Sequence, residues 1–435
     1  MSTKPKTQSR IIDVHGLARV EGEGALYLKI DGGKVTECKF KIFEPPRYFE
    51  AFLRGRSYRE VPDITARICG ICPVAYQMSS AHALEMAFGA TVDEPLRTLR
   101  RLLYCGEWIE SHVLHIFLLH LPDFLGYESA ITMAGDHRET VTKALQLKKA
   151  GNEIVNVLGG REVHPINARV GGFYRVPTKA ELEAVGERLK ANRPFAVDAC
   201  KLLGGLDFPD LEVDYDSVAL RHPDEIALNE GQVVTSRGLE VPIQHFLDHF
   251  EEVHVEHSNA LRGRLKRTGA YLVGPLARLN INWDLYPQYI KDLAEEIGFT
   301  IPCNNQFKSI VARALETLYA LDHAIEIIDR YERPDKPAVE ITPQASEGHG
   351  CTEAPRGILY HRYRTDDDGL VTDAVICPPT AQNQLQIEAD LAAFAPSVLD
   401  LDEEQMTIRC EQLIRNYDPC ISCSAHFLKL TLDRD

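Results

Sequence analysis

The residues with the clearest chemistry lie near the end of the chain. In Asp418-Pro419-Cys420-Ile421-Ser422-Cys423-Ser424-Ala425-His426, two thiols and an imidazole share one short segment. An Asp followed by a Pro is typical of a helix start, with Asp418 as the capping residue and Pro419 in the first helical position. Cys420 is then expected in the first turn, where unpaired N–H groups and the helix dipole favour the metal-binding thiolate. A single C-x-x-C pair is equally compatible with a redox disulfide, half of a zinc or iron–sulfur site, or two small buried residues.

A second C-x-x-C pair, Cys69 and Cys72, precedes Pro73 and another helical pattern. Because each pair opens a predicted helix, all four sulfurs can converge where two helix N-termini meet. Structural zinc sites usually hold pairs roughly fifteen to twenty residues apart, whereas most of the chain separates these two. Soft thiolates also bind nickel and iron. Spacing alone therefore leaves a zinc site and a redox-metal site open.

Helical periodicity predicts the elements that position these residues. The segment after Pro73 repeats apolar residues every three or four positions, which predicts a helix packed on one side. Residues 95–125 are apolar almost throughout, which predicts a helix buried within a bundle. Further helices are expected over residues 139–157, 179–202, 288–298, 305–331 and 403–415.

Short alternating runs predict two β-hairpins. In residues 11–43 the turn is Asp31-Gly32-Gly33, because Gly supplies the positive φ that such turns need. Residues 357–377 predict a strand, an Asp-Gly turn and a strand. A short helix within residues 47–56 is expected to place Phe49, Phe52 and Leu53 on one face. The Pro-rich residues 332–350 are expected to be irregular.

These elements predict a helix-rich α+β protein with a central bundle of long buried helices and small peripheral β-sheets. We expect one interleaved unit over residues 1–435. Its parts are an N-terminal β-hairpin region (11–60), a helical core (61–203 and 288–331), a peripheral region (204–287), a β-hairpin and loop region (332–400), a C-terminal helix with the metal motif (401–426) and a tail (427–435).

Composition narrows the class of protein. A hydrophobic content of 44% in 435 residues is enough for a large core. The net charge of −16 excludes a nucleic-acid-binding surface, which needs a basic excess. Eleven irregularly spaced cysteines indicate reduced thiols. The basic start MSTKPKTQSR is neither a signal peptide nor an anchor, and no apolar run reaches membrane-spanning length. We expect a soluble, cytoplasmic protein without a membrane segment.

Seven segments resemble one known family. Residues 67–72 (RICGIC) and 418–426 (DPCISCSAH) closely resemble the two signatures of the large subunit of nickel–iron hydrogenases. The other matching segments follow in the family's order: Arg19-Val20-Glu21-Gly22, Arg47-Tyr48-Phe49-Glu50, Gly159-Gly160-Arg161 with His164-Pro165, Glu353-Ala354-Pro355-Arg356-Gly357, and Pro378-Pro379-Thr380. The resemblance covers both ends and the middle of the chain, and it implies the fold of that large subunit.

The resemblance implies a nickel ion held by four cysteinates. Cys69 and Cys420 are then terminal ligands, while Cys72 and Cys423 bridge to an iron that carries two cyanides and one carbon monoxide. Such a buried site has a net negative charge, so a cation must lie close to it. Arg356 matches that cation, because a guanidinium is permanently charged and its fork can meet a ligand edge.

Further positions take roles by the same resemblance. Thr380 matches the residue that hydrogen-bonds one cyanide, and Asp418 is a capping residue that also places a charge beside the site. Cleavage of H2 releases a proton and therefore needs a base. The resemblance gives this role to Cys420, with Glu21 as the carboxylate that relays the proton outward.

A second metal ion is implied near the C-terminus. Glu50, His426 and the backbone carbonyl of Ile376 match the ligands of the family's magnesium site, which iron can also occupy. Residues 427–435 follow His426, where many relatives are cut, so this is either an uncut precursor or a branch that keeps a short tail. Our hypothesis is that the tail is removed or displaced when nickel is inserted.

Some residues depart from the commonest family pattern. Tyr76 stands where many relatives carry a His, Glu23 replaces a frequent His, and Ser111 lies where some relatives place an Asp. These differences resemble the cytoplasmic, multimeric branch that couples hydrogen to NAD(P) or to sulfur reduction.

Several histidines also suggest metal sites. His112 and His115 lie three residues apart, and His245, His249, His254 and His257 lie within fourteen residues. Without neighbouring thiols, we interpret all of them as packed or surface histidines.

The sequence thus predicts the catalytic subunit of a hydrogenase that interconverts H2 with protons and electrons. Its partners are expected to be a small subunit with iron–sulfur clusters and subunits that bind flavin and NAD(P). Two alternatives are a quinone-site subunit of the respiratory complex I type, which lacks the cysteine pairs, and a zinc-stabilised structural protein.

Overall fold

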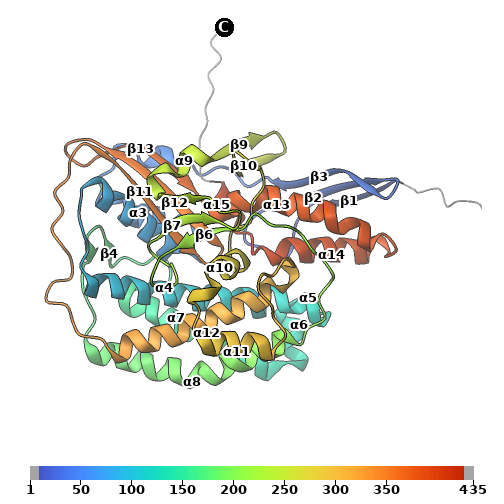
Figure 1. Ribbon diagram of the computed structural model, residues 1–435, viewed down its shortest axis with the longest axis horizontal. Helices are drawn as coiled ribbons and strands as arrows, with labels where there is room; N and C mark the ends of the chain where they lie inside the picture. The colour runs from blue at the N-terminus through green and yellow to red at the C-terminus, as the bar shows by residue number, and fades with distance from the viewer. Residues whose placement is uncertain (1–8, 426–435) are drawn as a thin grey trace, which may run out of the picture.

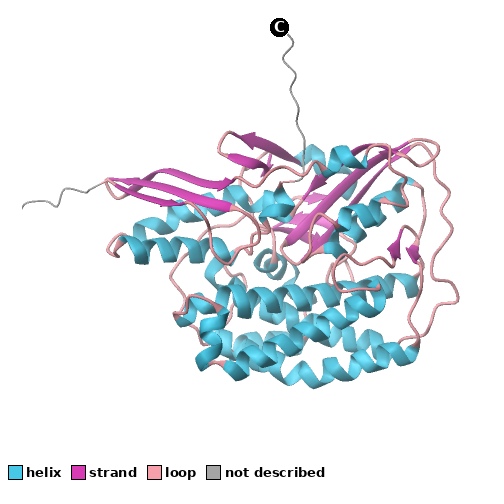
Figure 2. Cartoon of the chain, turned by 180° about the vertical axis from the view of Figure 1, so that it is seen from behind, coloured by secondary structure: helices cyan, strands magenta, loops and turns pink. Residues whose placement is uncertain are grey.

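The computed structural model describes residues 9–425 as helices below a set of small sheets (Figures 1 and 2). The helices are α1 Phe49–Leu53, α2 Val61–Ala66, α3 Pro73–Ala87, α4 Glu94–Leu114, α5 Leu121–Leu125, α6 Ala130–Asp136, α7 Arg138–Gly159, α8 Lys179–Gly204, α9 Phe246–His249, α10 Pro275–Asn282, α11 Gln288–Glu296, α12 Ser309–Asp329, α13 Pro379–Phe394, α14 Glu403–Asn416 and α15 Ile421–Ser424. A π-helix, η1 His115–His120, continues α4, and short 3-10 turns are η2 Ile243–His245, η3 Trp283–Leu285, η4 Gln306–Lys308 and η5 Ala395–Val398.

The strands form five small sheets, and every strand pairing within them is antiparallel. The strands are β1 Arg10–Val14, β2 Gly24–Asp31, β3 Lys34–Ile42, β4 Ala168–Arg169, β5 Gly172–Phe173, β6 Val218–Arg221, β7 Gln232–Thr235, β8 Glu240–Val241, β9 Phe250–Val255, β10 Ser258–Leu265, β11 Ser346–Ala354, β12 Gly357–Thr365 and β13 Val371–Cys377.

The long helices α4, α7, α8 and α12 pack on one another as a bundle and form the lower layer in Figure 1. Their apolar residues join α3 and β1–β3 in one large core cluster. A smaller cluster fills the space between β6–β7, β9–β10 and the inner face of β12. The predicted bundle, its long helices and both predicted hairpins are therefore confirmed. None of the helices between residues 9 and 425 is long and apolar enough to cross a membrane.

Three local predictions were wrong or incomplete. Helix α3 is buried on nearly every side rather than on one, because β11, β12 and α2 all pack against it. Phe52 is half exposed and does not share the buried face of Leu53 in α1. Strand β11 occupies part of the segment expected to be irregular, and helices α10 and α13 were not predicted.

Helix α3 and strand β11 approach so closely that only glycine fits between them. A Cβ atom at Gly348 would lie 1.9 Å from the carbonyl oxygen of Ala83, and one at Gly350 would lie 2.2 Å from that of Ser79. Both obstacles are backbone atoms, which cannot rotate away. This contact fixes the position of α3, and with it Cys72 at the start of that helix.

The first prediction concerns this contact. Gly348→Ala is expected to lower stability by about 1–3 kcal/mol or more, because the added methyl group overlaps the α3 backbone. Thermal unfolding of the purified protein measures the change. The matched control is Gly135→Ala, where the added Cβ atom would meet no other part of the protein within 4 Å. Equal melting temperatures for the two variants would contradict the packing argument.

Candidate metal centre

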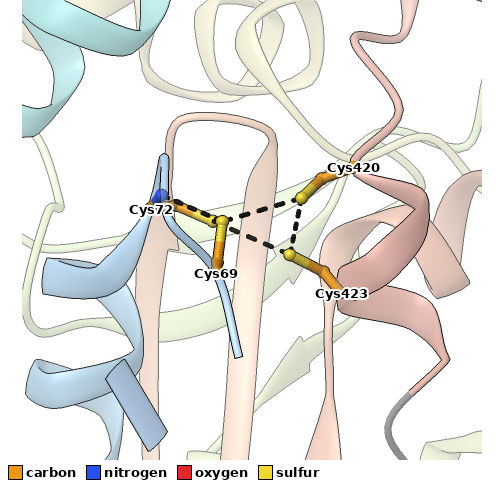
Figure 3. Close-up of side chains that lie close together, drawn as sticks. All are labelled: Cys69, Cys72, Cys420 and Cys423. Carbon is orange, nitrogen blue, oxygen red and sulfur yellow. Dashed lines mark hydrogen bonds between the residues drawn. The ribbon is translucent and has the colours of Figure 1, made fainter. Parts of the chain in front are cut away.

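The four cysteines of the two C-x-x-C pairs lie together in the interior (Figure 3). Their sulfur atoms all lie within 4.8 Å of one another, and all four side chains are buried. The Sγ–Sγ distances across the two ends of the chain are 3.6 Å for Cys69 and Cys420 and 4.0 Å for Cys72 and Cys423. In residues 9–425 no other group of three or more His, Cys, Asp or Glu side chains has metal-ligand geometry. Four converging thiols form a ligand set for a soft metal ion.

Asp418 does not cap a helix, which corrects the sequence prediction. Its backbone is left-handed, with φ 51°, and α15 begins only at Ile421, with Cys420 as its N-cap residue. Asp tolerates this conformation better than most residues. The carboxylate of Asp418 instead accepts a hydrogen bond from Arg356 at 3.1 Å, and its carbonyl oxygen accepts another at 2.7 Å. A distant arginine therefore determines the local conformation of the Asp-Pro pair.

Arg356 is a buried cation beside the thiols. Burial acts to lower its pKa, but Asp418 and the nearby thiols Cys420, Cys72 and Cys69 outweigh this and raise the pKa well above its usual value. Its Nη1 atom is buried and has no hydrogen-bond partner among the residues that the structure describes. One guanidinium donor thus remains for a group bound at the thiols.

The pKa values of the four thiols are not all shifted in the same direction. Burial is the main factor that raises the pKa of Cys72 and of Cys423, while hydrogen bonds with the other three thiols raise that of Cys420. The pKa of Cys69 is lowered: burial opposes this, but hydrogen bonds from the other thiols and the charge of Arg356 outweigh it. Metal cations bound at the cluster would stabilise the thiolate form of all four cysteines.

Glu21 joins the first sheet region to the C-terminal cysteine pair. The thiol of Cys420 donates to Glu21 Oε2 at 3.2 Å, and the same oxygen accepts the Ser422 N–H at 3.1 Å. The carbonyl oxygen of Glu21 accepts the Ile421 N–H at 2.9 Å. A Cβ atom at Gly22, where φ is +87°, would lie 2.8 Å from Ile421 Cβ, so only Gly allows this approach. Glu21 is thus the carboxylate that contacts Cys420.

Thr380 lies on the other side of Cys420. Its hydroxyl oxygen accepts the Cys420 N–H at 3.0 Å. Because the oxygen is the acceptor, the hydroxyl hydrogen is left to donate to a neighbouring group. Arg47 links the two cysteine segments by donating to the carbonyl oxygens of Ile68, at 2.7 Å, and Ser422.

A buried charge network that sequence reasoning missed supports the Arg356 segment. Arg278 donates to the carbonyl oxygens of Ala354 at 2.8 Å and Pro355 at 2.9 Å. It is held in turn by the carboxylates of Glu316 at 2.7 Å and Glu353 at 3.0 Å. The Trp108 ring lies 4.4 Å from the guanidinium carbon. The Glu353 block was a sequence signal for part of this network, but nothing marked Arg278 or Glu316.

Three of the histidines considered as ligands have other partners. His112 Nε2 lies 3.0 Å from a Glu316 carboxylate oxygen, and His115 Nε2 lies 2.7 Å from the Arg415 carbonyl oxygen. His245 pairs with Asp248. His112 therefore belongs to the Arg278 network, as a packed histidine.

The implied second metal site is described only in part. Glu50 Oε1 accepts the Ile376 N–H at 2.8 Å. Burial raises the pKa of Glu50 to about 7, and burial followed by the charge of Glu50 raises that of Glu252 to about 8. Two partly buried carboxyl groups whose charges repel are a setting that favours a cation. His426, the third predicted ligand, lies outside the described residues, as does the predicted change in the 427–435 tail.

The chain matches a known protein family over more than half of its length. The family model for nickel-dependent hydrogenase matches residues 47–143 and 267–426, which include all four cysteines. The chain belongs to the nickel-dependent hydrogenase family. This hydrogenase chain is an oxidoreductase subunit that acts on H2 at a nickel–iron centre, and the predicted family, fold class and enzyme class are confirmed.

Relatives match along nearly the whole hydrogenase chain. Sulfhydrogenase 2 subunit alpha from Pyrococcus furiosus is 37% identical over 428 residues, covering 97% of this chain and 100% of the relative. NAD-reducing hydrogenase HoxS subunit beta from Cupriavidus necator is 28% identical, covering 97% and 95%. The crystal structure of an NAD+-reducing nickel–iron hydrogenase in the H2-reduced state superposes with a TM-score of 0.87 at 26% identity, covering 97% and 100%.

Asp390 anchors the chain directly before the C-terminal cysteine pair. Its Oδ2 atom accepts hydrogen bonds from the Tyr417 hydroxyl at 2.6 Å and the Tyr215 hydroxyl at 2.7 Å, and its Oδ1 atom accepts one from Gln386 at 2.8 Å. Burial raises the pKa of Asp390 from 3.8 to about 6, and these hydrogen bonds act in the opposite direction.

The second prediction follows from this carboxyl group. Between about pH 4 and about pH 6 the unfolded chain loses the Asp390 proton before the folded chain does. The contribution of Asp390 to the free energy of unfolding therefore falls by up to about 3 kcal/mol as pH rises through this window, and it does not change further above it. Asp390→Asn is expected to remove that part of the pH dependence. Denaturant unfolding at several pH values measures it, with the exposed Asp400→Asn as a control that keeps the wild-type slope. An unchanged slope in Asp390→Asn would refute the assignment.

Proposed function

We propose that this chain oxidises H2 reversibly and that its electrons pass through a partner iron–sulfur subunit to NAD(P) or another soluble acceptor. The observation that carries the catalytic part is the group of four buried sulfurs within 4.8 Å, faced by an arginine with one unpaired Nη atom. The acceptor is proposed from the likeness to an NAD+-reducing enzyme and to an NAD-reducing hydrogenase subunit.

The roles of the four cysteines are proposed from the family resemblance. Cys69 and Cys420 are proposed as terminal nickel ligands, and Cys72 and Cys423 as ligands shared with an iron that carries two cyanides and one carbon monoxide. The residues present fit such a group, because the Arg356 Nη1 and the Thr380 hydroxyl are buried donors available to ligands of this kind. When bound, the nickel–iron centre supplies the cleavage of H2, from which a proton must leave.

The proton route is proposed from three contacts. The sulfur of Cys420 holds a proton 3.2 Å from Glu21 Oε2, which is close enough for direct transfer. Glu21 also holds the Ser422 N–H, and the Ser422 hydroxyl donates to Glu44 Oε2 at 2.8 Å. The Ser422 N–H holds the Glu21 carboxylate in place but cannot carry a proton, and Glu21 is itself only partly buried, so the proton can pass from Glu21 to solvent directly.

A second ion, magnesium or iron, is proposed at Glu50, the Ile376 carbonyl group and His426. The support is the pair of partly buried carboxyl groups, Glu50 and Glu252, whose pKa values are raised. An ion held there would join helix α1 and strand β13 to the residues after the last cysteine.

The partners are proposed from the same relatives. Within residues 9–425 the four thiols are the only metal-ligand cluster, so an electron relay needs a partner with iron–sulfur clusters. We propose a small subunit of that kind and further subunits that bind flavin and NAD(P), since the relatives are named as subunits. A cytoplasmic location is proposed from the composition and the reduced cysteines.

The third prediction tests the metal centre. Infrared spectra of the purified, nickel-loaded protein are expected to show cyanide and carbon monoxide stretches, which a zinc protein lacks.

Cys420→Ser is expected to lose nickel and activity. Arg356→Lys is expected to keep the bands while H2 oxidation falls roughly 100-fold, because lysine cannot reproduce the guanidinium fork. The exposed Arg330→Lys is the control. Active, nickel-replete protein without these bands would overturn the proposed function.

The fourth prediction tests the proton route. Glu21→Gln is expected to keep the infrared bands but to slow H2 oxidation roughly 100-fold or more, because the amide cannot take the proton from Cys420. Exchange of D2 with solvent protons gives an independent measure. Glu23→Gln is the matched control, since its side chain makes no contact with Cys420 among the described residues. Equal rates in both variants would remove Glu21 from the route.

A further inference from the structure

Glu107 reaches from helix α4 to the start of helix α3. Its Oε2 atom accepts the Val74 N–H at 2.6 Å, and its Oε1 atom accepts the Ala75 N–H at 3.1 Å. The side chain is completely buried. Because α3 begins at Pro73, which has no N–H, these are the first two N–H groups that the helix itself provides.

The N–H groups at a helix start normally bond to the side chain of the N-cap residue. Here the N-cap residue is Cys72, whose side chain makes no capping hydrogen bond. The N–H groups of Ile71 and Cys72 donate to the Cys69 sulfur at 3.3 and 3.0 Å. The donors around this helix start are therefore divided between one thiol and the Glu107 carboxyl group.

The opposite wall of the metal centre has the same arrangement. Helix α15 also begins after an N-cap cysteine, Cys420, which makes no capping bond with its side chain. The Ser422 N–H donates to the Glu21 carboxylate and the Ile421 N–H to the backbone carbonyl oxygen of Glu21, which comes from a distant part of the chain. Each cysteine pair thus starts a helix whose first N–H groups are accepted by a glutamate from another element.

We propose that Glu107 is a positioning residue of the metal centre: it caps α3 in place of Cys72, so that the Cys72 sulfur stays directed at the metal. The proposal rests on the proposed function of the four cysteines as ligands. Without the carboxyl group, two buried N–H groups lose their partners, which is costly. The helix start then rearranges, and Cys72 moves with it.

The surroundings of Glu107 are compatible with this role. Burial raises its pKa well above the usual range, the Glu110 carboxyl group adds to the effect, and the two N–H groups oppose it. A carboxyl group keeps acceptor lone pairs in either protonation state, so it bonds both N–H groups in each. Glu110 lies on the same helix and pairs with Lys148 at 3.2 Å, away from α3.

The fifth prediction compares three variants of the full-length protein purified with its metals. Glu107→Ala removes both acceptors, Glu107→Gln keeps one, and Glu110→Gln is the matched control one turn further along α4. Amide hydrogen exchange is measured for peptides covering residues 70–78, together with the infrared spectrum and the nickel content. Exchange at residues 74 and 75 is expected to be roughly tenfold faster in Glu107→Ala, with a smaller increase in Glu107→Gln.

The infrared spectrum separates positioning from a general loss of stability. Displaced cyanide and carbon monoxide bands in Glu107→Gln, with normal exchange elsewhere and unchanged bands in Glu110→Gln, would support the proposal. Unchanged exchange and bands in Glu107→Ala, or equal shifts in Glu107→Gln and Glu110→Gln, would overturn it. If the unmodified protein shows no such bands, the proposed function fails, while the exchange data still decide whether Glu107 caps α3.

Discussion

Four sulfur atoms that carry negative charge when they bind metal lie in the interior, and an unpaired charge there is very costly. A permanent cation, Arg356, lies beside the sulfur atoms and balances part of this negative charge, and other groups hold Arg356 in place. Asp418 accepts two hydrogen bonds from Arg356. Arg278 donates to the carbonyl groups of the two residues that precede Arg356 in the chain. Arg278 would itself be an uncompensated charge without Glu316 and Glu353. Charge balance at the thiols therefore extends through the helical bundle.

The backbone around the thiols obeys a second constraint. A cysteine that binds metal cannot also cap its own helix, although each pair stands at a helix start. Glu107 and Glu21 bond to the N–H groups that the cysteines leave unpaired. Glu21 also contacts a thiol directly, whereas the hydrogen bonds of Glu107 within residues 9–425 go to backbone N–H groups. A glutamate thus meets the helix start on each wall, and only the one on the C-terminal wall also reaches a sulfur.

Sequence reasoning succeeded where the signal is local or repeated. The long helices and the two hairpins follow from periodicity and glycine turns, and the two C-x-x-C pairs marked the cluster. It failed where residues far away in the chain determine the local conformation. Asp418 was expected to cap a helix, but its conformation depends on Arg356, 62 residues away in the chain. Strand β11 was not predicted because Gly348 and Gly350 give it no strand-like pattern. Both positions must be Gly, since the α3 backbone occupies the space that a side chain would need. Glu107 sits in an apolar helix, and only the structure shows which N–H groups it meets.

The ligand set has a consequence for how the protein is made. Cys69 and Cys420 are 351 residues apart, so at roughly 5–20 residues per second their synthesis is separated by about 20–70 s. During that interval the first two thiols and much of the bundle exist without the segment that completes the pocket. A chain that stops before Cys420 carries only half of the four-sulfur cluster. The pocket can therefore close only after Cys420 and Cys423 have been synthesised, because the first cysteine pair supplies only two of its four sulfurs.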